Sequence, residues 1–229
     1  MGGVAGRPGF EPGTYGLRAR RSARLSYRPT SRVYGLNQAG FIKIRWVPRY
    51  TAMALVVVEA LMPRLRRFVV ELAYEAFGEE GYWVEVGLSW SRRWARTLVL
   101  LEDGEPIGFN QVYAWPCCGT ILGVHHYVAV RGDRRGRGYG KVLVAAGEEV
   151  LDEMGGKVYA ATLRASNMAS RRMLEEMGYR VMAWSEAEEE LGAVCVDELM
   201  YVTGGYTDDL VALKPGGCPP RSLREALRC

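Results

Sequence analysis

Glycines and basic residues crowd into one short segment of the chain, residues 132–141. They are Gly132, Gly136, Gly138 and Gly140, with Arg134, Arg135, Arg137 and Lys141. An apolar run, Val124 to Val130, precedes the segment, and the apolar spacing from Val142 to Met154 predicts a helix after it. The backbone N–H groups of a glycine loop and the positive end of a helix dipole both favour an anion. The sequence therefore predicts a binding site for a phosphate or a pyrophosphate.

The glycine spacing distinguishes between known kinds of phosphate-binding loop. A Walker loop requires glycine and serine or threonine where this chain has Arg135 and Val142. A dinucleotide fingerprint requires two residues between its last two glycines, whereas here the glycines come at every second position. The segment Arg135-Gly-Arg-Gly-Tyr-Gly140 instead resembles the acetyl-coenzyme A pyrophosphate loop of the GNAT superfamily of N-acetyltransferases. The residues that this resemblance assigns to acetyl-coenzyme A are Arg135, Gly136, Arg137, Gly138, Tyr139, Gly140 and Lys141.

A second segment, Asn167 to Tyr179, carries the same resemblance. It is similar to the Asn-x-x-Ala/Ser…Gly-Phe/Tyr segment of the superfamily, in which the asparagine side chain contacts the cofactor. An asparagine before a helix is also a common N-cap, so both interpretations of Asn167 stay open. Its position 27 residues after Gly140 favours the cofactor contact.

The resemblance covers about residues 53–204 and implies a single GNAT-like domain of the α/β class. We expect a central, mostly antiparallel α+β mixed sheet that is splayed between two strands and flanked by helices. A basic extension at 1–52 and a C-terminal tail at 205–229 would flank this domain. The expected strands are 54–59, 97–101, 107–113, 120–130, 158–163, 179–184 and 195–203, and the expected helices are 63–78, 83–93, one after residue 140, and 168–177.

Shorter signals complete the expected elements. Asp103-Gly104 tolerates positive φ and predicts a tight hairpin, and residues 115–119 predict a turn. Ser222 and Glu225 have the spacing of a capping box for one short helix.

The catalytic arrangement is also implied by the resemblance. Acetyl-coenzyme A would lie between strands 124–130 and 158–163, with backbone groups of Val128 and Val130 paired to its pantetheine arm. Its thioester would be attacked directly by an amine. Acetyltransferases of the ribosomal-protein type carry a glutamate and a tyrosine where this chain has Thr162 and Leu174. That acid/base pair is therefore absent.

His126 is the substitute candidate for the base. With strict alternation along the strand it shares one face with Val124, Val128 and Val130, while His125 points to the other face. The serotonin N-acetyltransferase branch carries an imidazole at the matching position, and an imidazole with a pKa near ~6.5 suits the task. The alternative is a histidine that is satisfied inside the sheet. Candidate acids for the leaving thiol are Tyr113, Tyr139 and Tyr159.

Charge and composition restrict the remaining possibilities. Residues 1–52 hold ten Lys/Arg residues and one acid, a net charge of +9, while the rest of the chain carries −5. We expect the segment to be disordered; the alternatives are an arm that binds RNA, or a start of translation at Met53. The five cysteines form no CxxC pair, and their odd number favours a reduced, cytoplasmic setting. The longest apolar stretch, Met53 to Met62, is too short to cross a membrane.

Other clusters predict less. Cys117-Cys118 and His125-His126 lack the usual spacing of zinc ligands, so we expect no metal site. The acidic run Glu186 to Glu190 predicts a solvated loop, although it would also attract a cationic amine.

Two functions follow from the sequence. The first is transfer of acetyl from acetyl-coenzyme A to a primary amine, either a small molecule or a protein N-terminus or lysine. The alternative is a GNAT-like module without turnover that binds acyl-coenzyme A, or that binds RNA through residues 1–52. The oligomeric state is not readable from the sequence.

Overall fold

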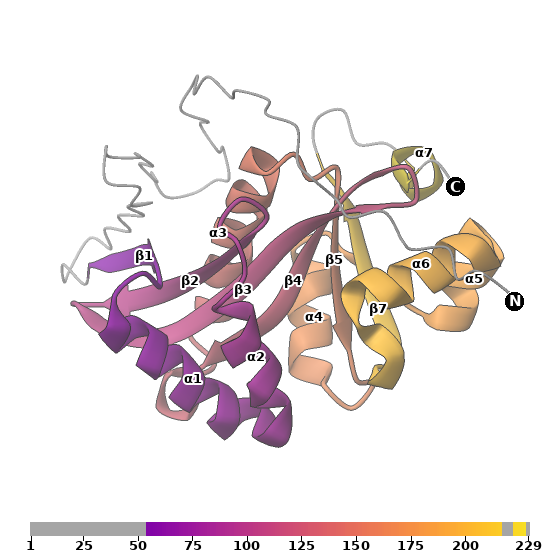
Figure 1. Cartoon of the computed structure of the whole chain (residues 1–229). Coiled ribbons are helices and arrows are strands. Elements are labelled where there is room, and N and C mark those ends of the chain that lie inside the picture. The colour runs from indigo at the N-terminus through magenta and orange to yellow at the C-terminus, as the bar shows by residue number, and fades with distance from the viewer. Residues whose placement is uncertain (1–53, 217–221, 228–229) are drawn as a thin grey trace, which may run out of the picture.

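The protein forms one seven-stranded sheet with helices on both faces (Figure 1). The computed structural model describes residues 54–216 and 222–227, so the expected basic extension lies outside the described residues. The strand order is β1-β2-β3-β4-β5-β7-β6, and every neighbouring pair is antiparallel except the parallel pair β4 and β5. The expected mixed, mostly antiparallel sheet is therefore confirmed.

The helices and strands have the following bounds in chain order. They are β1 (Leu55–Glu59), α1 (Pro63–Phe77), α2 (Gly81–Gly87), β2 (Ala95–Glu102), β3 (Glu105–Cys117), β4 (Thr120–Val130), α3 (Tyr139–Glu153), β5 (Val158–Leu163), α4 (Met168–Glu176), β6 (Arg180–Ala183), α5 (Trp184–Leu191), α6 (Ala193–Thr203), β7 (Leu210–Pro215) and α7 (Leu223–Leu227). Short 3₁₀ turns lie at Gly78–Glu80, Gly132–Arg134 and Gly205–Thr207.

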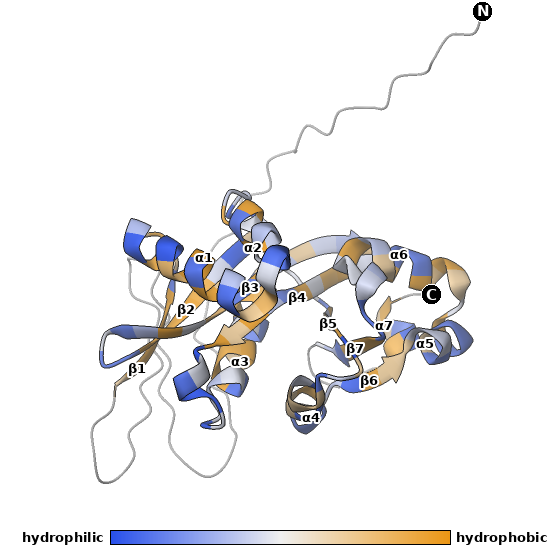
Figure 2. Ribbon diagram, turned by 90° about the horizontal axis from the view of Figure 1, so that it is seen from below, coloured by the Kyte–Doolittle hydropathy of each residue, from blue (hydrophilic) through white to orange (hydrophobic). Residues whose placement is uncertain are grey.

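Helices cover the two faces of the sheet separately. Leu65 and Val69 of α1 pack with Phe109 of β3 on one face, and Leu143 of α3 packs with Leu100 of β2 on the other. Figure 2 shows α1, α2 and α6 on one side of the sheet and α3 and α4 on the opposite side. Burial of these apolar faces, at roughly 25 cal/mol per Å², holds the helices against the strands.

Tight turns join β2, β3 and β4. Asp103 and Gly104 both have positive φ, as the Asp-Gly signal predicts. The expected turn at 115–119 is wrong in extent, because β3 continues to Cys117 and only Cys118 and Gly119 have positive φ. The expected helix at 83–93 is also wrong in extent, since α2 occupies Gly81–Gly87.

The expected strand at 195–203 is wrong, because these residues belong to the helix α6. Its buried residues are Cys195, Val196, Leu199, Val202 and Thr203, which follow a helical period. Gly192 and Gly204, both with positive φ, bound the helix. The last strand of the sheet is instead β7, which pairs with β5 and β6. The expected domain boundary at residue 204 therefore falls before a strand of the sheet.

The acidic run belongs to helix α5 rather than to a loop. Glu186 accepts a hydrogen bond from the backbone N–H of Ala183 at 3.2 Å, and Glu190 forms an ion pair with Arg180 at 2.5 Å. Two carboxylates of the run, those of Glu186 and Glu190, thus have structural partners at the start of α5 and on β6.

Three findings concern the last helix, the cysteines and the hydrophobicity of the helices. The capping box of α7 is confirmed, since Ser222 and Glu225 exchange two hydrogen bonds of 3.2 Å. Cys195 is disulfide-bonded, whereas Cys117 and Cys118 are free thiols. Within the described residues, no helix combines the length and the hydrophobicity that crossing a membrane requires.

Candidate active site

The sheet opens between its two parallel strands. β4 and β5 pair only through Leu122–Val124 and Val158–Ala160, and the following residues of both strands share no register. A cavity of about 740 Å³ occupies this divergence. Its lining includes three of the predicted site residues, namely His126, Val128 and Asn167. Val130 and residues 135–141 are not part of the lining; the loop reaches the cavity through Gly140, which lies against the lining residue Met173.

A β-bulge in β4 changes which side chains share a face. Val112 pairs with His125 and Gln111 pairs with Tyr127, so His126 is an inserted residue without a Cα partner in β3. His126 therefore lies on the face of α1 and α2 with Val124. Val128 and Val130 pack on the opposite face with α3. The predicted common face of His126 with Val128 and Val130 is wrong, because the bulge shifts the alternation by one residue.

The surroundings of His126 fix its tautomer. The Gln111 amide nitrogen donates to the Val84 carbonyl (3.0 Å) and to Thr97 Oγ1 (3.2 Å), which leaves Gln111 Oε1 as an acceptor. His126 Nδ1 lies 2.9 Å from this oxygen and must donate to it. The second nitrogen, Nε2, then carries the lone pair. The imidazole stacks on Trp90 at 5.4 Å, and burial lowers its pKa to about 4.

His125 has a different, structural environment beneath α3. Its Nδ1 lies 3.0 Å from Asn110 Nδ2, and its Nε2 lies 2.9 Å from the hydroxyl of Tyr179. The Asn110 amide also donates to the carbonyl of Leu143 in α3 at 2.9 Å. Burial, with the nearby charge of Lys214, lowers the pKa of His125 to about 3. Both imidazoles are therefore neutral at pH 7, and only His126 has a nitrogen without a partner in the described residues.

The glycine loop leads directly into α3. Gly136 (φ 76°) and Gly138 (φ 81°) adopt left-handed conformations, and Gly138 is the N-cap of the helix. No side chain caps α3, and a Cβ at Gly136 or Gly138 would meet no atom within 4 Å. Backbone N–H groups at the start of α3 are thus available to an anion that approaches closely.

The basic residues of the glycine loop differ in whether they already have ion-pair or hydrogen-bond partners. Arg134 pairs with Glu102 at 3.1 Å, and Lys141 pairs with Glu176. Arg135 Nε donates to the carbonyl of Val130 at 3.1 Å. The Val130 carbonyl, which was predicted to pair with the pantetheine arm, therefore already has a hydrogen-bond partner within the chain. Arg137 is exposed beside the hydroxyl of Tyr139.

Asn167 takes the structural role that its position before a helix indicates. Its Oδ1 accepts a hydrogen bond from the Ser170 backbone N–H at 3.2 Å and caps α4. The residue also lines the cavity, so the cap and the predicted cofactor contact are compatible.

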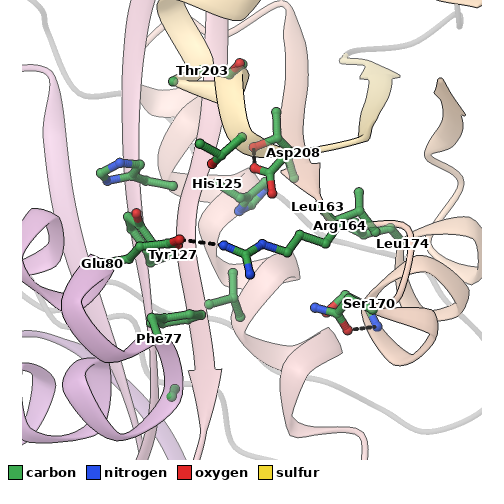
Figure 3. A pocket seen from close by; sticks show the side chains of 18 of the residues that line it. Phe77, Glu80, His125, Tyr127, Leu163, Arg164, Ser170, Leu174, Thr203 and Asp208 are labelled. Atoms are coloured by element: carbon green, nitrogen blue, oxygen red, sulfur yellow. Dashed lines mark hydrogen bonds and ion pairs between the residues drawn. The ribbon is translucent and has the colours of Figure 1, made fainter. Parts of the chain in front are cut away.

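Several cavity residues were not predicted from the sequence (Figure 3). Tyr127 follows His126 on β4, and burial followed by the charges of Glu80 and Asp208 raises its pKa to about 12. Arg164 reaches Glu80 at 2.6 Å across the cavity. None of the three tyrosines predicted as acids lines the cavity. The hydroxyls of Tyr113, Tyr139 and Tyr159 donate instead to the Val202 carbonyl, to Glu102 and to Asp152, respectively.

A cysteine cluster lies apart from this cavity. Cys117 and Cys118 have sulfur atoms 3.5 Å apart, and with Glu198 they offer ligand atoms within 4.8 Å of one another. His125 and His126 take no part in this group.

Comparisons with known proteins agree with this architecture. A glucosamine N-acetyltransferase region of a fungal multi-domain β-N-acetylglucosaminidase superposes with a TM-score of 0.51 at 15% identity, over 58% of this chain and 18% of that longer one. A GNAT acetyltransferase from Staphylococcus aureus Mu50 gives 0.52 at 9% identity, over 71% of this chain and 99% of the other. A GNAT-family protein from Desulfovibrio desulfuricans gives 0.53 at 15% identity, with the same coverage.

These structural likenesses concern the fold, and no curated protein sequence matches the chain. The sequence model of the acetyltransferase (GNAT) family matches residues 62–179, from the start of α1 to Tyr179. The match contains the diverging strands, the glycine loop and the cap of α4. The chain belongs to the GNAT acetyltransferase family.

Proposed function

We propose that this protein transfers the acetyl group of acetyl-coenzyme A directly to a primary amine, either a small molecule or a protein N-terminus or lysine. The observation that carries the proposal is the divergence of β4 and β5 into a cavity of about 740 Å³ beside the uncapped start of α3. An extended thioester and an amine can meet in such a cavity, with the anionic end of the thioester at the helix N-terminus.

The residues present fit coenzyme A by their chemistry. The open left-handed glycines Gly136 and Gly138 allow a diphosphate to reach the backbone N–H groups of α3, and Arg137 is exposed beside them. Beyond Val124, the edge of β4 has no partner in β5, so backbone groups there are available to an extended arm. When bound, the thioester supplies an electrophilic acyl carbon.

His126 would take the proton that the attacking amine loses. Because Gln111 holds Nδ1 as a donor, the lone pair on Nε2 is the basic site. With a pKa of about 4, the imidazole is unprotonated throughout the neutral range. A base of this strength serves by accepting a proton as the N–C bond forms, and it stays unprotonated down to about pH 5. The thiolate that leaves takes its proton from solvent.

Release of coenzyme A thiol, measured with acetyl-coenzyme A and a panel of amines, tests the proposal. We expect amine-dependent thiol release that falls by about 10²- to 10⁴-fold in kcat in His126→Ala. The variant His126→Gln, which keeps a donor for Gln111, should lose a similar factor without losing affinity for acetyl-coenzyme A by calorimetry. Equal rates at saturating substrate would remove His126 from the mechanism.

A non-catalytic acyl-coenzyme A-binding module is the competing function. It is favoured by Thr162 and by Leu174, a buried side chain that can transfer no proton. Such a module would bind acetyl-coenzyme A saturably and release no thiol with any amine. The RNA-associated alternative depends on residues 1–52, and deleting them should leave acetyl transfer unchanged under our proposal.

A further inference from the structure

A carboxylate from outside the predicted site lies in the wall of the cavity. Asp208 precedes β7, far in sequence from β4 and β5, and it lines the same cavity as His126. Its Oδ2 accepts a hydrogen bond of 2.6 Å from Thr162 Oγ1 on β5. Its backbone carbonyl accepts a further hydrogen bond of 3.0 Å from Trp184 Nε1. These two bonds fix both the loop and the carboxylate, which is partly buried (Figure 3).

Charge balance around the cavity leaves Asp208 without a counter-ion. Glu80, the other carboxylate of the lining, is neutralised by Arg164 at 2.6 Å. Within the described residues, no lysine or arginine forms an ion pair with Asp208, whose side chain is bonded only to the neutral hydroxyl of Thr162. A carboxylate that has lost part of its hydration and has no positive partner is stabilised by any cation that enters the cavity.

Aromatic side chains in the lining of the same cavity give it the character of a pocket for an amine with an apolar skeleton. The Tyr127 ring lies 4.4 Å from the His126 ring and 4.9 Å from the Phe77 ring, measured between centroids. Asp208 and Tyr127 line the same cavity, and the charge of Asp208 contributes, after burial and Glu80, to the raised pKa of Tyr127. Trp83, which is half exposed, adds another apolar wall at the cavity.

We propose that Asp208, held by Thr162, binds the ammonium group of the acceptor, and that the acceptors are primary alkylammonium ions carrying an apolar skeleton. The inference rests on the proposed function for its catalytic consequence. The ammonium ion held by Asp208 loses one proton to solvent, and the resulting amine gives its second proton to His126 as the N–C bond forms. Asp208 acts on specificity: it draws the charged form of the amine into the cavity. An amine that is uncharged at neutral pH gains nothing from this carboxylate.

Two probes and one matched control separate this role from general damage. Hexylamine is charged at pH 7, whereas O-benzylhydroxylamine is uncharged there. In Asp208→Asn the amide can still accept from Thr162, so we expect the fold to be kept. The KM for hexylamine should rise by about 10- to 100-fold, and the KM for O-benzylhydroxylamine should change less than about twofold.

The control variant is Asp209→Asn, which removes the same charge one residue away. Asp209 accepts a hydrogen bond from the Ala165 backbone N–H at 2.7 Å, which an asparagine can also accept, and it does not line the cavity. Its KM for hexylamine should stay near that of the unmodified protein. Thr162→Val, which frees the carboxylate from its clamp, should raise the KM for hexylamine by a smaller factor.

Binding of hexylammonium, measured by calorimetry without acetyl-coenzyme A, keeps the two proposals apart. Binding that is lost in Asp208→Asn supports the ammonium site even if no thiol is ever released, and the transferase proposal alone then fails. An Asp208→Asn protein that binds and uses hexylamine as well as the unmodified protein overturns the inference, whatever its rate of turnover.

Discussion

Acidification should unfold this protein through its two histidines, which are the only histidines in the chain. Both are neutral in the folded state, with pKa values of about 3 for His125 and about 4 for His126 because of burial. In the unfolded chain an imidazole titrates near ~6.5. The unfolded state therefore takes up protons first, and stability that is fully present above pH 6.5 is lost as the pH falls toward the folded values.

The size of the effect follows from these numbers. Each pH unit between 6.5 and the folded pKa costs about 1.36 kcal/mol per histidine. Between pH 6.5 and 5.0 this amounts to 1.36 × 1.5, or about 2 kcal/mol for each, and about 4 kcal/mol for the pair. His126 retains part of its exposure, so its share is the smaller one. A domain of ordinary stability, about 5–15 kcal/mol, would lose a large part of it.

Urea unfolding at pH 7.5 and 5.0, followed by tryptophan fluorescence, measures this loss. Carboxylates add their own pH dependence to every variant, so the informative quantity is the difference between proteins. His125→Gln should lose about 2 kcal/mol less than the unmodified protein over this interval, and His126→Gln should lose less by a smaller amount, about 1–2 kcal/mol. If His126→Gln and the unmodified protein lose the same free energy of unfolding, His126 is not held neutral and our reasoning about its pKa is refuted.

Four further substitutions test the packing around the site and the cap of the last helix. Gly147→Ala should destabilise the fold by about 1–3 kcal/mol in urea unfolding, because its Cβ would lie 2.4 Å from Asn110 Nδ2 and 2.7 Å from His125 Cε1. Gly138→Ala meets no neighbour, so its φ of 81° alone should cost about 1 kcal/mol in thermal unfolding and weaken acetyl-coenzyme A binding. Gly132→Ala, where φ is not positive and space is open, is the control for both and should change stability by less than about 0.5 kcal/mol. Ser222→Ala should speed hydrogen exchange across α7, consistent with a loss of about 0.5–2 kcal/mol at the cap.

Local signals account for the parts of the fold that the sequence predicts well. The β1, β4 and β5 strands are short apolar runs with β-branched residues, and α1 begins at Pro63, a favoured first helical residue. The glycine loop was predictable because three of its features are local: the strand before it, the positive-φ glycines and the helix after it. None of these depends on what the rest of the chain does.

The α6 helix shows where local reasoning failed. The apolar residues from Cys195 to Thr203 include several β-branched side chains, and a short apolar run of this kind is compatible with a strand or a buried helix. Gly192 and Gly204, just outside the helix, were the available signal for helix ends. With the last strand assigned too early, β7 and the Asp208 loop were left in a tail, and a site residue went unnoticed.

The unpredicted loop bears on the proposed chemistry through the contact of Asp208 with Thr162. On β5 it lies where a related branch carries a glutamate, and the sequence alone shows only that the carboxylate is absent. The structure sets Asp208 against its hydroxyl, so a carboxylate reaches the cavity from the loop before β7 instead of from the strand. Such a contact spans 46 residues. It depends on the pairing of β5 with β7, which no local pattern around residue 162 reveals.

The β-bulge at His126 also depends on strand pairing, so the local sequence did not predict it. Alternation along a strand predicts faces correctly only while the pairing register holds, and the register is a property of two strands together. Because β4 carries one extra residue opposite β3, His126 and Tyr127 both face α1 and α2, while Val128 and Val130 turn toward α3. A regular strand would have sent Tyr127 to the α3 face, away from Asp208 and Glu80. The inserted residue thus puts a neutral imidazole and a protonated phenol side by side in one cavity, an arrangement that a period of two forbids.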